Sequence, residues 1–124
     1  MTYYLINGFN ILPYVAEDGI KWSRNDVDGD NAGRVLNLAK MQRDRLAIKM
    51  RHDFTLRELT TQELRQIYRA IEPVFVTVQY DGSATSDTAV TRVMYSNNMS
   101  GTLAEVYDEE TDLHKNITFP LIEQ

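Results

Sequence analysis

The chain has 124 residues, 43% of them apolar, no cysteine, and a formal net charge of −5. It can form neither a disulfide nor a thiolate metal site, which suits the cytoplasm, and its acidity argues against general affinity for nucleic-acid phosphates. No apolar run reaches the roughly 18 residues that a membrane helix needs. The N-terminal residues lack the pattern of a signal peptide. We therefore expect one domain over residues 1–124 and no membrane partner.

The N-terminal quarter predicts short strands joined by turns. Asn7-Gly8 separates two apolar runs, which is the strongest short-range hairpin signal. Pro13 should end the second strand or place it at a sheet edge, and Asp18-Gly19 should form a turn. A third short strand follows around Trp22, and we expect this tryptophan in the core or covering the sheet rather than as a ligand platform.

Residues 26–33 form a polar stretch with alternating aspartates. The stretch is similar to a calcium-binding loop, but its sixth position is Asn31 rather than glycine and its twelfth is Asn37 rather than glutamate. We therefore predict a flexible acidic turn without a metal ion. The weakly patterned residues 35–41 form either a strand or an irregular approach to the next strand.

The central part of the chain predicts one long strand and one helix. Apolar and polar residues alternate over residues 46–56, which indicates a strand with one buried face. Thr60 and Glu63 have the spacing of a capping box at the start of a helix over residues 61–71. Its apolar stripe is Leu64, Ile67, Tyr68 and Ile71.

The C-terminal half predicts four strands, over residues 74–80, 90–96, 102–107 and from residue 113 to the C-terminus. Pro120 suggests that the last strand lies partly at an edge. The predicted fold class is α+β and mostly antiparallel, with about seven strands curled into a sandwich or partial barrel and one helix packed on one side.

No pattern of catalytic residues is evident in the sequence. His52 falls on the core-facing phase of the long strand, where a satisfied buried histidine is expected, and His114 is expected in solvent. The carboxylates lie in turns and tails, not as a pair in a cleft. We predict no enzymatic activity, no cofactor and no metal. An enzyme acting on carbohydrate or nucleic acid remains an alternative, with His52 as the residue to test.

Charge is unevenly distributed along the chain. Residues 34–69 have a formal charge of +5, whereas residues 70–124 have −7. These regions are either solvated faces of one monomer or complementary patches that meet between subunits. Aromatic residues are not interleaved with the basic residues of the long strand, so an ionic interface fits them better than base recognition.

Several ordered motifs run along the chain: Ile6-Asn7-Gly8, Asn31-Ala32-Gly33-Arg34, Met41-x-Arg43-x-Arg45-x-x-x-Lys49, Leu59-Thr60-x-x-Glu63, the strand from Phe75 to Tyr80, and Phe119-x-Leu-Ile-Glu123. Together they resemble a family of small phage and prophage proteins encoded among tail genes. The chain departs from this family at Leu38-Ala39, where relatives carry a glycine, and at Asp81-Gly82, where they carry Asp-Pro.

The resemblance implies a structural protein of the phage virion, made in the cytoplasm of the bacterial host. We expect a ring-forming hub of the tail tip or baseplate, or a tail-tube component, with itself and other tail proteins as partners. The alternative is a monomeric tail-assembly or head–tail adaptor factor that is not an enzyme.

Two sets of residues are predicted to carry such an assembly. The subunit interface would join Arg34, Arg43, Arg45, Lys49 and Arg51 of one copy to Asp108, Glu109, Glu110 and Asp112 of its neighbour. A loop that becomes ordered on a partner would comprise Asp81, Gly82, Ser83, Thr85, Ser86 and Asp87.

Overall fold

The computed structural model describes the backbone of residues 1–28, 33–34, 41–42 and 45–124, and the side chains of residues 1–26 and 48–124. The elements of the N-terminal half are β1 (Tyr4–Ile6), β2 (Phe9–Asn10), the 3₁₀ turn η1 (Leu12–Tyr14), β3 (Val15–Asp28), β4 (Gly33–Arg34), β5 (Met41–Gln42) and β6 (Arg45–Leu56). The remaining elements are β7 (Leu59–Thr60), α1 (Thr61–Ile71), β8 (Val76–Tyr80), β9 (Val90–Tyr95), β10 (Ser100–Glu105) and β11 (Leu113–Glu123).

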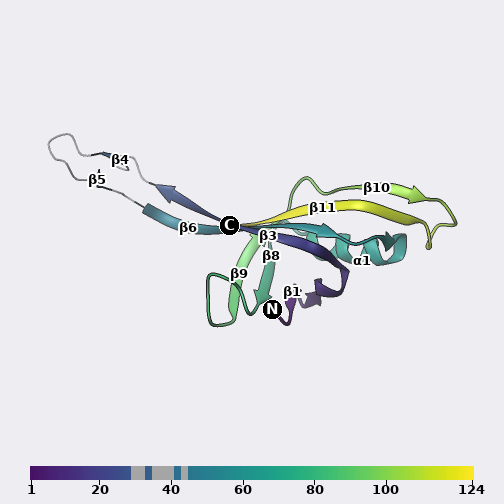
Figure 1. The fold of residues 1–124 in the computed structure, drawn as a ribbon, viewed down its shortest axis with the longest axis horizontal. Helices are drawn as coiled ribbons and strands as arrows, with labels where there is room; N and C mark the ends of the chain where they lie inside the picture. Colours follow the sequence, from purple (N-terminus) through teal and green to yellow (C-terminus); the bar gives the residue numbers. More distant parts are fainter. Residues whose placement is uncertain (29–32, 35–40, 43–44) are drawn as a thin grey trace.

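The described strands form one curled sheet, a half-barrel (Figure 1), and a separate two-stranded ribbon of β4 and β5. The sheet follows the order β2-β1-β8-β9-β11-β6-β3, with β10 and β7 also paired to β11. Every pairing between described strands is antiparallel. The predicted fold class, mostly antiparallel strands curled into a partial barrel with one helix, is therefore confirmed.

Local sequence signals account for the first hairpin and for the start of the helix. Asn7 and Gly8 both have positive φ, at 49° and 85°, as a two-residue hairpin turn requires. The hydroxyl of Thr60 accepts a hydrogen bond from the Glu63 N–H, and the Glu63 carboxylate accepts one from the Thr60 N–H. The predicted capping box and the helix bounds are thus both confirmed.

The apolar stripe of α1 is only partly buried. Ile67 and Ile71 join the core of the sheet, and Leu64 packs against it from one side. Tyr68, the fourth predicted member, keeps 53% of its surface exposed. The prediction is wrong for Tyr68 because the helix contacts the sheet over a narrower face than the full stripe.

Aromatic rings fill the centre of the core. Tyr4 stacks on Tyr80, with 5.2 Å between the ring centroids, and Phe54 stacks on Phe119 at 5.0 Å. The edge-to-face contact between Tyr4 and Phe54 joins the two stacks, so strands from both ends of the chain pack into one core.

The longest strands project beyond this core as a hairpin. The ladder between β3 and β6 continues from Ile20↔Phe54 out to Asp28↔Arg45, and β4 and β5 follow beyond it (Figure 1). We call the outer strands, residues 21–28, 33–34, 41–42 and 45–51, the arm. Its existence shows that the third strand is much longer than the sequence predicted.

The polar residues at the outer end of β3 explain this difference. Asp26 and Asp28 were predicted to belong to a turn, but they lie in β3, where the pairing with β6 supplies backbone hydrogen bonds that the local sequence does not reveal. Asp18-Gly19 is likewise not a chain reversal, because the register shift between Val15 and Ile20 makes it a bulge within β3. Of the predicted weak strand, residues 35–40 lie outside the described residues, and Met41 begins β5.

Of the two prolines in the sheet region, only Pro120 differs from expectation. Pro13 lies in the 3₁₀ turn that follows β2, and β2 is an edge strand of the sheet, as predicted. Pro120 lies in the middle of β11, a central strand, which corrects the prediction of an edge. One side of β11 changes its partner from β10, last paired at Thr118, to β9, first paired at Ile122. Pro120 lies between these two pairings. Its missing N–H is therefore tolerated, because no hydrogen bond to β10 or β9 is needed at this position.

Candidate assembly surface

Opposite charges lie at opposite ends of the molecule. The described strands of the arm hold six basic residues and two acidic ones. The connection between β10 and β11 lies at the other end of the longest axis (Figure 1). We call residues 105–112 the acidic tip, because they hold five carboxylates and no basic residue. The fold therefore keeps the cations of the arm away from the carboxylates of the acidic tip.

Two of the predicted basic residues can be placed with their side chains. Lys49 and Arg51 share the face of β6 opposite to the buried Met50 and His52, as the alternation predicted. Arg51 already contacts the carboxylate of Asp53 at 3.0 Å. Both side chains of that pair are more than 40% exposed, so a neighbouring carboxylate could compete for the guanidinium at little cost.

The other predicted cations are placed less completely. Arg34 lies in β4 and Arg45 begins β6, so the backbone of both belongs to the arm, but their side chains are outside the described part. Arg43 lies outside the described residues altogether. The predicted ionic contact with a neighbour therefore stays a prediction.

The acidic tip is a turn fixed by its own carboxylates. Asp108 accepts hydrogen bonds from the N–H groups of Glu110 and Thr111, both at 2.9 Å, and these bonds lower the pKa of its carboxyl. Asp112 accepts a bond from the Tyr107 N–H at 2.6 Å. Glu109 is exposed and makes none of these bonds. The turn thus holds a carboxylate-rich surface in a defined shape.

The backbone of the same turn contacts the helix. The Thr61 N–H donates to the Asp112 carbonyl at 3.0 Å, and the Gln62 N–H donates to the Glu110 carbonyl at 3.2 Å. Both donors belong to the first turn of α1, whose N–H groups have no partner within the helix. The acidic tip is therefore anchored to the body of the protein.

Large apolar side chains accompany the carboxylates at this end. Val106 and Tyr107 are 74% and 64% exposed, and Leu103 of β10 is also exposed. These exposed apolar side chains make this end of the hairpin a candidate contact surface.

The loop predicted to become ordered on a partner packs on its own subunit. Asp81 accepts hydrogen bonds from the Thr2 hydroxyl and from the N–H groups of Thr2 and Tyr3, which lower the pKa of the carboxyl. The Ser86 hydroxyl contacts Thr88, while Asp87 is exposed. Whether a partner adds to this order stays a prediction.

The same loop covers a small cavity at the base of the arm. The cavity has a volume of about 340 Å³ and is lined by Met1, Ile20, Trp22, Met50, His52, Gly82, Ser83, Ala84 and Thr85. Trp22 lines this cavity and is 55% exposed, so of the two predicted placements the core is wrong, whereas a position covering the sheet is not contradicted.

His52 is buried and hydrogen-bonded, as predicted. Its Nδ1 lies 2.6 Å from the Tyr4 hydroxyl, and only 4% of the residue is exposed. Burial, with a smaller contribution from Arg92, lowers the pKa of His52 to about 4. Arg92 itself is paired with Glu123 at 2.9 Å. The sequence placed His52 on the inner face but could not show that β1, β9 and β11 supply these neighbours.

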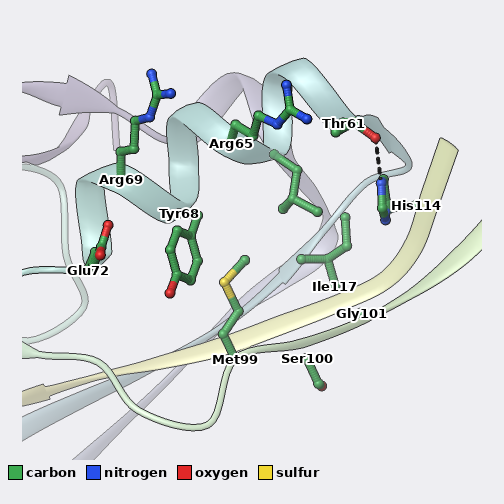
Figure 2. Close-up of a pocket in the computed structure, with 11 residues that line it drawn as sticks. Thr61, Arg65, Tyr68, Arg69, Glu72, Met99, Ser100, Gly101, His114 and Ile117 are labelled. Atoms are coloured by element: carbon green, nitrogen blue, oxygen red, sulfur yellow. Dashed lines mark hydrogen bonds between the residues drawn. The ribbon is translucent and has the colours of Figure 1, made fainter. Parts of the chain in front are cut away.

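An open groove between α1 and the β10–β11 hairpin was not predicted (Figure 2). It has a volume of about 520 Å³ and is lined by Thr61, Leu64, Arg65, Tyr68, Arg69, Glu72, Met99, Ser100, Gly101, His114 and Ile117. At one end the Thr61 hydroxyl contacts Nε2 of His114 at 2.8 Å, so this histidine is half-buried rather than solvated as expected. The ring of Tyr68 is exposed because it lines this groove instead of packing into the core.

Among the described residues, no group of three or more His, Cys, Asp or Glu side chains is placed to hold a metal ion. The described part of the chain has no helix with the length and apolar character needed to cross a bilayer.

Comparisons with known protein families, with curated proteins and with solved structures found no match for this chain.

Proposed function

We propose that this chain is a non-enzymatic structural protein of a phage tail that assembles head to tail into a ring, as a tail-tip or baseplate hub or as a tube component. The observation that carries the proposal is the separation of the basic arm from the acidic tip along the longest axis. The resemblance of the sequence motifs to tail-encoded phage proteins supplies the biological setting.

The physical argument concerns the symmetry of the contact. A surface that is basic at one end and acidic at the other can pair about a twofold axis only as an antiparallel dimer, in which each arm meets the tip of the other copy, and it can also pair successively from copy to copy. It is complementary when the arm of one copy meets the acidic tip of the next. Such a contact is heterologous, and it closes into a ring when the rotation between copies permits.

The remaining charge fits passage of DNA through the ring. The net charge of −5 would give the lumen an acidic lining once the arm cations are engaged between subunits. Repulsion between this lining and the phosphates would let DNA slide instead of binding.

The test is the mass of the purified protein at low and high salt, together with electron microscopy of the same samples. We expect closed rings at low salt and their dissociation at high salt, because exposed ion pairs are screened. A strict monomer at every protein concentration would contradict ring formation.

A second measurement separates the ring protein from an assembly factor. We expect the chain in purified virions at a fixed copy number. A chain that is monomeric and absent from the particle would instead be an assembly or adaptor factor.

A further inference from the structure

The groove between α1 and the β10–β11 hairpin has an apolar floor that no described segment covers. Leu64 and Tyr68 contribute from the helix, and Met99 and Ile117 from the opposite wall (Figure 2). Its volume of about 520 Å³ lies within the range of pockets that hold ligands or peptide side chains. The floor can therefore accept at least one large apolar side chain.

Two arginines on the helix side of the groove have no counter-ion among the described residues. Arg65 and Arg69 lie one turn apart and point away from the apolar floor in Figure 2. The four other arginines with described side chains each contact a carboxylate: Arg24 with Asp26, Arg51 with Asp53, Arg57 with Glu63, and Arg92 with Glu123. Arg65 and Arg69 are therefore the two whose charges stay available to a partner.

This arrangement is unfavourable for the helix alone. Like charges four residues apart destabilise a helix by about 0.2–0.5 kcal/mol. Glu72, which also lines the groove, is not ion-paired with Arg69 among the described contacts. A carboxylate supplied from outside would remove the repulsion and give both guanidinium groups a partner.

We propose that this groove binds a segment of a different protein, in which an apolar anchor is flanked by carboxylates. The anchor occupies the floor at Tyr68 and Met99, and the carboxylates meet Arg65 and Arg69. This goes beyond the proposed ring assembly, because it assigns a second surface to a second kind of partner.

The charges of this chain disfavour its own arm and its own acidic tip as the occupant. The acidic tip lies at the same end of the molecule as α1, so placing it in the groove of another copy would bring two acidic tips together. The arm is basic and would meet the two arginines with like charge. The partner is therefore an acidic segment from another polypeptide.

The test uses two short fluorescein-labelled peptides that share the same leucine positions. One carries glutamate and the other lysine at the flanking positions. We expect the glutamate peptide to bind the full-length protein at least about tenfold more tightly by fluorescence anisotropy. The amide signals of residues 64–72 and 99–101 should shift on addition of that peptide in ¹⁵N-labelled protein.

Charge reversal provides the decisive variant. The double change Arg65→Glu and Arg69→Glu should invert the preference, so that the lysine peptide binds more tightly. Tyr68→Ala should weaken the glutamate peptide about tenfold without inverting the preference, because it removes the apolar floor only. Lys115→Glu, an exposed β11 residue that does not line the groove, is the matched control and should leave binding unchanged.

Three outcomes would overturn the proposal. The first is a preference that survives the double reversal. The second is a set of amide shifts located on the arm rather than on α1. The third is a shift of the groove signals on concentrating the protein without peptide, which would make a second copy the occupant.

Discussion

At the scale of single residues, the most informative side chain is His52. Its neutral ring forms a hydrogen bond with the Tyr4 hydroxyl inside the core, and burial raises the pKa of that hydroxyl well above its usual range. Both groups are therefore uncharged in the folded protein at neutral pH. The pair stabilises the fold only while His52 stays neutral. Lowering the pH, which protonates the histidine, therefore tests its contribution to stability.

Stability should fall as the pH drops from 6.5 to about 4. The folded protein holds the pKa of His52 at about 4, below the ordinary value of 6.5, so the unfolded chain takes up a proton first. The expected loss over this range is about 3 kcal/mol, because each tenfold change in proton affinity corresponds to about 1.4 kcal/mol of free energy. Urea unfolding at several pH values measures it.

The His52→Gln variant isolates this effect from the other titrating groups. It should lose the part of the pH dependence between 6.5 and 4 that belongs to the histidine, whatever its stability at neutral pH. The carboxylates with lowered pKa, such as Asp81 and Asp108, titrate equally in both proteins. An unchanged pH slope in the variant would contradict the assignment.

At the scale of the elements, local chemistry determines where α1 begins. The capping box satisfies one helix N–H and fixes the strand-to-helix junction, and the acidic tip supplies two further acceptors. The first turn of the helix is therefore held both by its own sequence and by a distant segment.

Removing the cap should cost about 1 kcal/mol. Thr60→Ala deletes the hydroxyl that accepts the Glu63 N–H, and loss of an N-cap costs about 0.5–2 kcal/mol. Thr60→Ser keeps the acceptor and should stay close to the wild type. Chemical unfolding of the three proteins checks this, and equal losses in both variants would show that packing of the threonine methyl matters instead.

The bulge at the base of β3 depends on a glycine. A Cβ at Gly19 would lie 2.4 Å from the Thr55 carbonyl oxygen and 2.6 Å from that of Ala16. Both are backbone atoms within the β3–β6 region and cannot move without breaking the register. The arm can therefore join the body only if this position has no side chain.

Gly19→Ala should destabilise the protein by about 2–3 kcal/mol, the upper range for overpacking. Gly8→Ala is the matched control, because it adds a Cβ that meets nothing within 4 Å and suffers only from its positive φ of 85°. Its cost should be about 1 kcal/mol. Equal free energies of unfolding for the two variants would contradict the close approach at Gly19.

At the scale of the whole molecule, the sequence predicted those elements whose formation depends on residues close to one another in the chain. Alternation and turn residues located β6, β8, β9 and β11, and the capping box located α1. The length of the arm was missed because Asp26 and Asp28 favour turns and become strand only through pairing with β6. The groove at Tyr68 was missed because a helical stripe predicts burial without showing how far the opposing sheet extends.

The separation of charge leads to the final prediction, a charge exchange between the two ends. Lys49→Glu in the arm and Glu109→Lys in the acidic tip should each weaken self-association at low salt about tenfold, by placing like charges in the contact between neighbours. The double variant should recover the wild-type mass distribution, since each arm then meets a tip of opposite charge. Neither residue holds the fold together, because Lys49 lies outside the core and Glu109 makes none of the bonds that fix the tip. Light scattering across a salt series measures all four proteins, and a double variant weaker than either single one would contradict a head-to-tail contact.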